Sequence, residues 1–252
     1  MTDWIVGFHA VDAVVRREPA RVRHLYLQAD RRDKRMRALE QLAADQGCSI
    51  SRIPRADLDE LVAGRHQGVA AEVATSGRTT DWKEADLMAL VETSQDPLIL
   101  VLDGVTDPHN LGACLRSADA AGALAVVVPQ DGSAALSPVA RKVASGAAET
   151  VPLVRVTNLV RALKALQQRG LWVVGTSGEA DQTLYDQDLT GPVAVVMGAE
   201  GSGMRRLTTE CCDFLIRLPM QGAVTSLNVS VATGICLFEA LRQRQMAELQ
   251  SR

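Results

Sequence analysis

Apolar runs that alternate with helical patterns are the feature that most restricts how the second half of this chain can fold. The run from Leu98 to Leu102 is continuous, which is typical of strands buried on both faces of a parallel sheet. Helical patterns lie between the runs, and this order predicts an α/β domain with a mostly parallel sheet covered by helices on both faces. The other runs are residues 123–128, 171–174, 193–197 and, more weakly, 214–218, and the helical patterns are residues 111–121, 138–148, 159–169 and 229–245.

The first part of the chain shows a second, smaller α/β pattern. A polar stretch, residues 75–81, follows it, and residues 93–97 interrupt the periodicity again after a short helical stretch. We therefore predict a small domain at 1–74, a linker at 75–95 and a larger domain at 96–252. In the small domain we expect strands near residues 22–27, 49–53 and 68–73, and helices from residue 9 and over residues 32–45 and 56–62.

Composition indicates a soluble globular protein. Hydrophobic residues make up 47% of the chain and aromatic residues only 3%, so its cores should be aliphatic. No apolar run approaches the roughly 18 residues that span a bilayer, and the N-terminus lacks a secretion signal, so we expect a cytoplasmic protein with no membrane partner. The five cysteines form no Cys-x-x-Cys pair and the four histidines show no ligand spacing, which predicts reduced thiols and no bound metal.

Positive charge gathers near the N-terminus, although the whole chain has a net charge of −3. Residues 12–37 hold nine basic side chains against four acidic ones, and eight of the nine are arginines. The planar guanidinium group suits phosphate, so the segment favours nucleic-acid binding, and a solvated helix face is an equally weighted alternative. The candidate RNA-binding residues are Arg16, Arg17, Arg31, Arg32 and Arg35, together with Arg141 and Lys142 on a later helix, where surface charge is again the alternative.

Three loops of small and polar residues follow strands of the predicted parallel sheet, at residues 103–110, 198–203 and 219–228. Ligands of such sheets bind beyond the carboxyl ends of the strands, so the three loops imply a composite site. The glycines of residues 198–203 stand at relative positions 1, 4 and 6, whereas a dinucleotide fingerprint needs 1, 3 and 6. Glu200 would also repel a pyrophosphate, and no Walker A sequence is present.

The same loops suit a ligand with a cationic or neutral centre, held by backbone groups where small residues allow a close approach. S-adenosylmethionine is such a ligand, because its sulfonium is cationic and its adenine needs an apolar slot. Gly198, Leu218 and Leu227 are candidates for that slot. Thr176, directly after a strand, is a further candidate cofactor contact, or else an ordinary strand-end residue.

The loops also carry three ordered motifs. Asn110 and Arg116 stand in Asn-Leu-Gly-x-x-x-Arg, and Glu200 stands in Gly-x-Glu-Gly-x-Gly. Ser226 and Asn228 stand in Ser-Leu-Asn-Val-Ser. With these motifs the chain resembles the SpoU (TrmH) family of RNA 2′-O-ribose methyltransferases, within the SPOUT superfamily. The resemblance implies S-adenosylmethionine as methyl donor, a SPOUT-type sheet with a trefoil knot near the C-terminus, and a homodimer whose active site takes residues from both subunits.

The small domain extends the resemblance. Residues 1–74 are similar to the family's substrate-binding domain, which has an L30e-like α/β fold. Together with residues 7–11 and 66–69, they imply the members that methylate a guanosine in the P-site loop of 23S ribosomal RNA. A transfer-RNA ribose methyltransferase of the same family is the enzymatic alternative. A non-catalytic RNA-binding or ribosome-assembly factor is the alternative from another class, and the intact motifs disfavour it.

The resemblance implies catalytic roles for the five motif residues. Family precedent makes Arg116 the base that deprotonates the ribose 2′-hydroxyl. A guanidinium stays protonated in ordinary surroundings, however, which equally favours Arg116 as a phosphate clamp that stabilises the developing alkoxide. We expect Glu200 to accept hydrogen bonds from Asn110 or Arg116. The non-catalytic alternatives are an ion pair of Arg116 with Asp119, an exposed turn carboxylate at Glu200, and helix capping by Asn110, Ser226 and Asn228.

Overall fold

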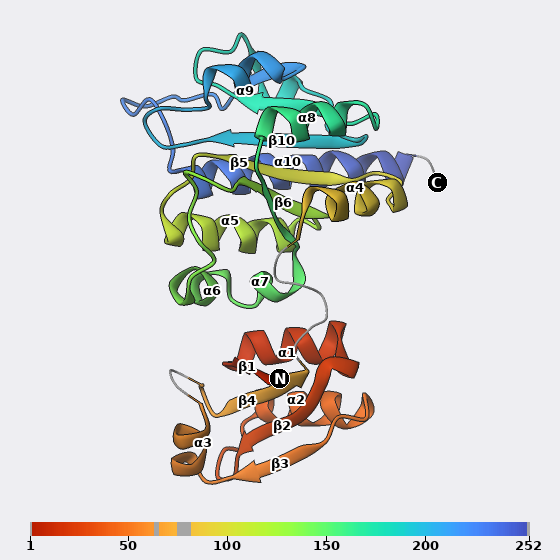
Figure 1. Ribbon diagram of the computed structural model, residues 1–252, viewed down its shortest axis with the longest axis vertical. Helices are drawn as coiled ribbons and strands as arrows, with labels where there is room; N and C mark the ends of the chain where they lie inside the picture. Colours follow the sequence, from red (N-terminus) through yellow and green to blue (C-terminus); the bar gives the residue numbers. More distant parts are fainter. Residues whose placement is uncertain (1, 63–65, 75–81, 251–252) are drawn as a thin grey trace. The chain divides into compact units, whose positions relative to one another are not determined.

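The computed structural model describes residues 2–62, 66–74 and 82–250. The chain divides into two compact units, Met1–Thr79 and Thr80–Arg252, called here the N-terminal and the C-terminal unit (Figure 1).

The N-terminal unit is a four-stranded sheet with the strand order β1-β4-β2-β3. Only β2 and β3 pair in parallel, and β4 is antiparallel to both β1 and β2. Helices α1 and α2 cover one face, where Val11, Leu25 and Leu39 belong to its main core. The elements are β1 (Thr2–Val6), α1 (Phe8–Arg17), β2 (Val22–Gln28), α2 (Lys34–Asp45), β3 (Ile50–Ile53), α3 (Arg55–Leu61) and β4 (Val69–Ala74), with a 3-10 turn η1 (Pro19–Arg21).

The C-terminal unit contains a seven-stranded sheet with the strand order β7-β6-β5-β10-β8-β11-β9. Every pairing in it is parallel, as the apolar runs predicted. Its strands are β5 (Leu98–Asp103), β6 (Ala125–Pro129), β7 (Leu153–Val156), β8 (Trp172–Thr176), β9 (Gln182–Thr183), β10 (Val193–Gly198) and β11 (Phe214–Arg217). Its helices are α4 (Glu84–Thr93), α5 (Pro108–Ala120), α6 (Pro138–Ala144), α7 (Ala147–Thr150), α8 (Leu159–Gln167), α9 (Arg206–Cys211) and α10 (Val229–Gln250), with a 3-10 turn η2 (Leu184–Asp186).

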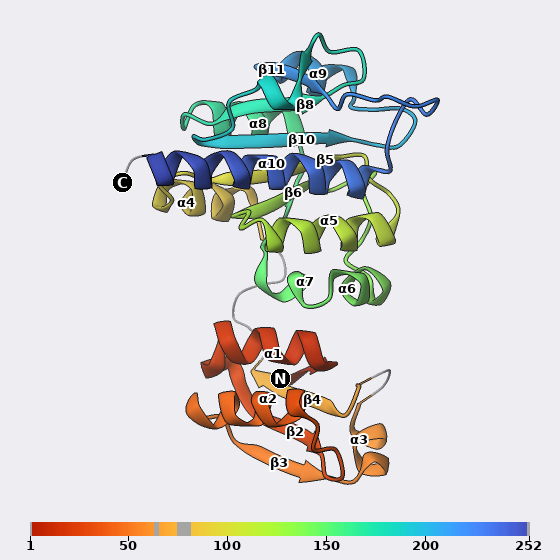
Figure 2. The same cartoon turned by 180° about the vertical axis from the view of Figure 1, so that it is seen from behind.

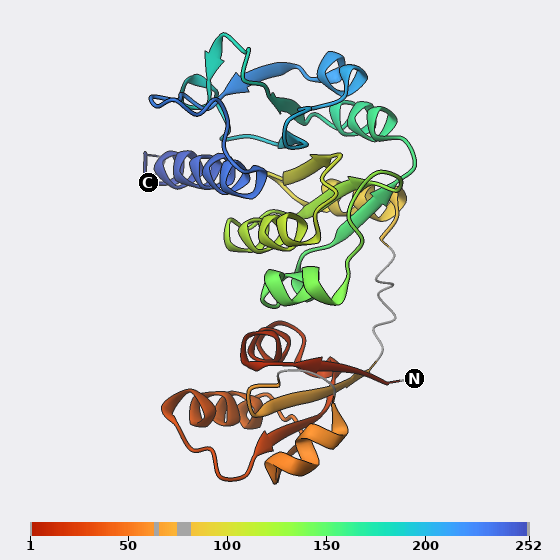
Figure 3. The same cartoon turned by 90° about the vertical axis from the view of Figure 1, so that its left-hand side faces the viewer.

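Side chains of β5 alternate between two cores, one on each face of the sheet. Leu98, Leu100 and Leu102 belong to the core beneath α5, α6, α7 and α10. Ile99 and Val101 belong to the core beneath α4, α8 and α9. Figure 3 shows these two groups of helices on opposite sides of the strands. A strand with both faces covered must be apolar at every position, which explains the continuous run.

Helix starts follow local hydrogen-bonding signals. The Asp107 carboxylate accepts the His109 amide at 2.9 Å, and Pro108 is the first residue of α5. The Asn158 side chain accepts the Arg161 amide at 3.0 Å at the start of α8. The capping that we considered for Asn110 is wrong, because α5 begins two residues earlier at Pro108 and its cap is Asp107.

The segment predicted as a linker, residues 75–95, differs from that prediction in its second half. Residues 84–93 form α4, and Leu87, Met88 and Val91 are buried in a core of the C-terminal unit. Trp82 forms an isolated parallel β-bridge with Val154 of β7. The polar residues of α4 hid this apolar face from a reading of periodicity. Residues 75–81 lie outside the described part of the chain.

The helix predicted over residues 138–148 is two helices. Ser145 and Gly146 have φ angles of 51° and 99°, and this left-handed backbone ends α6 before α7 begins. The strands β1, β7 and β9 and the helix α9 were not predicted. None of the described helices has the length and apolar character needed to cross a bilayer.

The chain doubles back near its C-terminus. After β10 it passes to β11, which lies beyond β8, and it then returns so that α10 packs against β10 and α5 (Figure 2). This return places the loop after β11 beside the loops after β5 and β10.

Candidate active site

The three motif loops meet through the side chains of Asn110, Glu200 and Asn228. Asn110 Nδ2 donates to Glu200 Oε1 at 3.2 Å, and Asn228 Nδ2 donates to Asn110 Oδ1 at 3.0 Å and to Glu200 Oε1 at 2.5 Å. The Val229 amide donates to the same Glu200 oxygen at 3.1 Å. One carboxylate oxygen therefore joins the three segments that follow β5, β10 and β11. The sequence predicted that these segments lie at the same edge of the sheet, but not that they are joined in this way.

Asn228 also begins the last helix, as the capping alternative predicted. Its Oδ1 accepts the Ser230 amide at 3.0 Å, the Ser230 hydroxyl at 2.6 Å and the Val231 amide at 3.4 Å. The amide oxygen thus orients α10 while the amide nitrogen holds Glu200 and Asn110. Capping and site assembly coexist in one side chain. Ser226 is exposed in the same loop, two residues before the cap.

The loop after β10 is narrow where Ala199 and Gly203 face each other, a feature called here the pinch, and Glu200 lies at the tip of this loop. Ala199 and Gly203 exchange backbone hydrogen bonds of 3.0 and 2.9 Å. A methyl group at Gly198 would lie 2.3 Å from the Gly203 carbonyl carbon and from the Met204 nitrogen, so this position needs glycine. Gly201 and Gly203 have φ angles of 79° and 68°, which glycine adopts without strain.

Asp103 is a structural member of the site that sequence reasoning missed. Its side chain is buried, and its carboxylate accepts the Arg205 amide at 2.9 Å and binds the guanidinium at 2.6 Å. This ion pair ties the end of β5 to the residues that follow the second motif. The available signal was a carboxylate directly after an apolar run, where a buried charge needs a partner.

The residues predicted for the cofactor lie around the same loops. Leu218 and Leu227 are half-buried and pack against the core beneath α5 and α10. The Thr176 hydroxyl donates to the Val196 carbonyl at 3.1 Å, so it links the ends of β8 and β10. With Gly198, these residues offer apolar surface and closely approaching backbone next to Glu200, which fits an adenine and a sulfonium.

Arg116 is the motif residue that the structure does not bring to this cluster. Its side chain is exposed and makes no hydrogen bond or ion pair within the described part of the chain, so the alternative pairing with Asp119 is not formed. Six residues separate it from Asn110, which is about 9 Å along α5 and about 240° around it. Asn110 faces α10, whereas Arg116 lies near the side of Gly112, which packs against Ala140 of α6.

Several candidate RNA-binding residues already have partners. Arg16 pairs with Asp12 at 2.8 Å, and Arg141 pairs with Glu149. Arg31 binds Asp33 and the Gln67 carbonyl. Arg35 lies over the Phe8 ring, 4.6 Å from its centre. Arg32 and Lys142 are exposed, and the side chain of Arg17 lies outside the described part.

The buried cysteines have protonated, unreactive thiols at neutral pH. Burial raises the pKa of Cys114 to about 11 and that of Cys236 to about 12, so both remain thiols at neutral pH. Cys114 donates to the Thr233 hydroxyl at 3.5 Å, where α5 packs on α10. These two residues contribute to packing.

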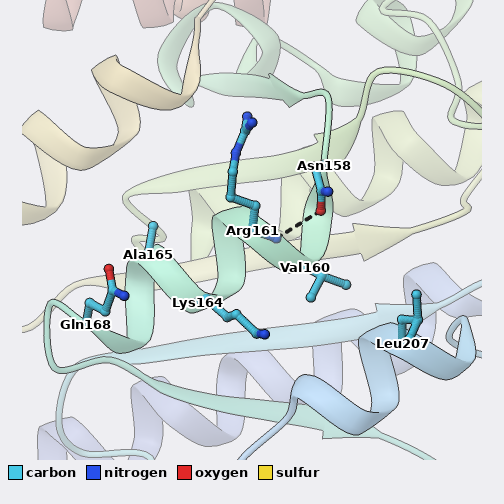
Figure 4. A pocket seen from close by; sticks show the side chains of 7 residues that line it. All are labelled: Asn158, Val160, Arg161, Lys164, Ala165, Gln168 and Leu207. Carbon is cyan, nitrogen blue, oxygen red and sulfur yellow. Dashed lines mark hydrogen bonds between the residues drawn. The ribbon is translucent and has the colours of Figure 1, made fainter.

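A separate hollow lies between α8 and α9. It has a volume of about 480 Å³ and contains Arg161, Lys164 and Leu207 in its lining (Figure 4). A neighbouring pocket of about 540 Å³ reaches Arg205 and Thr208. Neither is lined by a predicted catalytic or cofactor residue, so the catalytic assignment rests on the motif loops.

Comparison with known proteins agrees with this site. Residues 97–238 match the SpoU rRNA Methylase family, and residues 4–77 match the RNA 2′-O ribose methyltransferase substrate binding family. The chain is 62% identical over 241 residues to the 23S rRNA (guanosine-2′-O-)-methyltransferase RlmB of Pseudomonas syringae pv. tomato, which covers 95% of both chains.

Solved structures show the same fold. A crystal structure of an RNA 2′-O ribose methyltransferase has a TM-score of 0.73 at 29% identity, over 97% of this chain and 89% of the other. The SpoU methyltransferase AviRb from Streptomyces viridochromogenes, in complex with AdoMet, has a TM-score of 0.69 at 25% identity, over 97% and 91%. The chain belongs to the SpoU rRNA methylase family.

Proposed function

We propose that the protein transfers a methyl group from S-adenosylmethionine to the ribose 2′-hydroxyl of a guanosine in 23S ribosomal RNA. The observation that carries this proposal is the assembly of Asn110, Glu200 and Asn228 from three separate motifs at one edge of the sheet. The relative at 62% identity, which extends over both units, is named for this activity. A bacterial ribosomal RNA substrate places the protein in the cytoplasm.

The cofactor pocket is formed by the loops after β8, β10 and β11. Leu218 and Leu227 hold the adenine against the core, and the narrow backbone at Gly198 brings peptide groups close to it. The bound cofactor supplies an electrophilic methyl group on a sulfonium. Glu200, whose carboxylate stands at the loop tip, adds negative charge near that cation and holds the two asparagines in place.

Arg116 acts as a cation. A guanidinium stays protonated, so it binds the phosphate beside the target ribose and stabilises negative charge that develops on the 2′-oxygen. Orientation of the hydroxyl in line with the methyl group lowers the entropy barrier for transfer. Ser226 and Asn228 lie beside the cofactor loop and contact the reacting ribose.

The position of Arg116 supports a homodimer. It lies away from its own Asn110–Glu200–Asn228 cluster, so we propose that it completes the site of the partner subunit. Helix α10 carries an exposed apolar stripe that suits such an interface. Val231, Phe238, Met246 and Leu249 are 51%, 48%, 46% and 65% exposed. At about 100° per residue they fall within roughly 80° of one another.

The proposal is tested by offering labelled S-adenosylmethionine and unmodified 23S ribosomal RNA to the protein and mapping the product. We expect one 2′-O-methylguanosine. Transfer RNA serves as the competing substrate, and preferential labelling of it would support the enzymatic alternative. Label on a base would refute the mechanism, and absence of both transfer and cofactor binding would support a non-catalytic RNA-binding factor.

A further inference from the structure

The outer face of the N-terminal sheet carries a cluster of aromatic rings. The rings of Trp4 and Tyr26 are 5.5 Å apart, and those of His24 and Tyr26 are 4.6 Å apart. His24 Nε2 is 2.8 Å from the Ser51 hydroxyl on the neighbouring strand. Helix α3 covers the other part of this face, where Leu58 and Val62 pack on Ala70. The ring cluster therefore extends beyond the helix.

A β-bulge in β2 places two consecutive polar side chains on this face. Val22 pairs with Val73 and His24 pairs with Glu72, so Arg23 is an extra residue in the strand. Val22 and Leu25 both enter the main core, whereas Arg23 is exposed and His24 is half-buried. Without the bulge, strict alternation would put one of these two side chains into the core.

Because of the bulge, the cationic side chain of Arg23 lies on the same sheet face as the aromatic rings. Arg23 is next to His24 in the strand. His24 pairs with Glu72, which in turn pairs with Trp4 on the other side. Within the described part of the chain, the side chains of Arg23 and Glu72 make no hydrogen bond or ion pair. Stacking surface, an arginine, a carboxylate and a hydroxyl thus share one sheet face. Bulges that redirect side chains are common next to binding sites.

We propose that this face, formed by Trp4, Arg23, His24, Tyr26 and Glu72, binds an unpaired nucleotide of the RNA substrate. The proposal rests on the proposed function, because it assigns the face to that same RNA. A base stacks on the Trp4 and Tyr26 rings, and Arg23 binds its phosphate. Glu72 and Ser51 provide an acceptor and a hydroxyl for the base edge, a combination that suits purines with exocyclic N–H donors.

A nucleotide fits this face better than a protein does. Stable protein interfaces bury roughly 800 Å² on each partner around an apolar centre. In the described part of the N-terminal unit, only Trp4 and Leu61 are exposed large hydrophobic residues. Single-stranded RNA is recognised by aromatic side chains that stack on splayed bases, with arginine on the backbone. Residues 4–77 match a substrate-binding family of RNA methyltransferases.

The test compares two RNAs of equal length and charge, one a hairpin with an unpaired loop from 23S ribosomal RNA and one a continuous duplex. For the full-length protein, Trp4→Ala should raise the Kd for the hairpin about 5- to 150-fold, the range for loss of one base–aromatic stack. The Kd for the duplex should not change. Trp4→Phe keeps a ring and should retain most of the hairpin affinity.

Arg23→Ala provides a second, independent readout, because an exposed arginine can be removed without disturbing the core. The slope of log Kd against log salt concentration for the hairpin should fall by about 0.7, as expected for one lost phosphate contact on a single strand. Arg55→Ala is the matched control, since Arg55 is an exposed arginine of the same unit, on α3. It should leave the slope unchanged.

A methyl-transfer assay distinguishes a failure of this inference from a failure of the proposed function. If Trp4→Ala and Arg23→Ala raise KM for 23S ribosomal RNA and leave kcat unchanged, the face binds substrate. If the wild-type protein methylates the RNA and neither variant changes KM, Kd or salt slope, the rings only stabilise the sheet and the inference is wrong. If the wild-type protein transfers no methyl group, the proposed function fails first. Should Trp4→Ala not fold, the salt slope and the KM of Arg23→Ala decide the test.

Discussion

Replacement of Gly198 by alanine tests whether the cofactor loop depends on close backbone packing. The added methyl carbon would lie 2.3 Å from the Gly203 carbonyl carbon and from the Met204 nitrogen. Both atoms belong to the backbone, so no side chain can rotate away. The chain must instead open the pinch between Ala199 and Gly203, whose two hydrogen bonds measure 3.0 and 2.9 Å. Glu200 moves with that loop.

The size of the effect follows from these contacts. Two backbone hydrogen bonds contribute about 0.5–1.5 kcal/mol each, and overpacking of a tight site costs about 1–3 kcal/mol, so we expect a loss of about 1–3 kcal/mol of unfolding free energy. For a domain of this size the Tm should fall by roughly 2–12 °C. If the loop opens in the folded state, the Kd for S-adenosylmethionine should rise about 5- to 150-fold.

Differential scanning calorimetry and isothermal titration calorimetry measure the two quantities. Gly191→Ala is the matched control, because a methyl group there would meet no atom within 4 Å. The control should leave both the Tm and the Kd unchanged. If Gly198→Ala also leaves both unchanged, the pinch is not required for cofactor binding, and the steric argument for this position is refuted.

Three further predictions follow from the site and the interface. Arg116→Ala should abolish methyl transfer while the Kd for S-adenosylmethionine stays within about twofold, because in the proposed mechanism the guanidinium contacts RNA and not the cofactor. Phe238→Asp should dissociate the proposed dimer in analytical ultracentrifugation, because it places a charge in the exposed apolar stripe of α10. Cys236 should resist iodoacetamide up to about pH 9 in the folded protein and react on unfolding, because burial raises its pKa to about 12 and only the thiolate reacts.

Each of these predictions has an outcome that contradicts it. Unchanged turnover of Arg116→Ala would remove Arg116 from the active site, with Arg161→Ala as the control for a general loss of positive charge. A Phe238→Asp protein that sediments like the wild type would place the subunit contact elsewhere, and Glu248→Ala provides a polar control on the same helix. Rapid alkylation of native Cys236 at pH 8 would mean that α10 detaches from the core.

Local patterns were sufficient where a residue's environment depends on its neighbours in sequence. The run from Leu98 to Leu102 predicted a strand covered on both faces, and the structure places alternate side chains in two cores. The pattern failed at α4, which was assigned to a linker. Its buried Leu87, Met88 and Val91 sit among acidic residues, and only the sheet beneath them shows which face is apolar.

The sequence likewise predicted only part of the candidate site. The motifs identified Asn110, Glu200 and Asn228, and sequence reasoning predicted a hydrogen bond from Asn110 or Arg116 to the Glu200 carboxylate, which Asn110 makes. Sequence could not show that one Glu200 oxygen serves both asparagines and the Val229 amide. It could not find the Asp103–Arg205 pair either, since these residues are far apart in the chain and meet only because β5 lies next to β10.

The order of apolar runs, small loops and motif residues by itself determined the α/β class of this protein, the edge of the sheet that carries its site, and its family. The class and the edge follow from periodicity and residue chemistry over a few neighbours, and the family follows from the resemblance of the three motifs to those of known proteins. Only the tertiary structure decided that Arg116 faces away from its own cluster, that α4 belongs to the C-terminal unit, and that a bulge brings Arg23 beside the aromatic face. Helix rotation, strand order and register depend on contacts between distant segments, and these contacts leave no local pattern in the sequence.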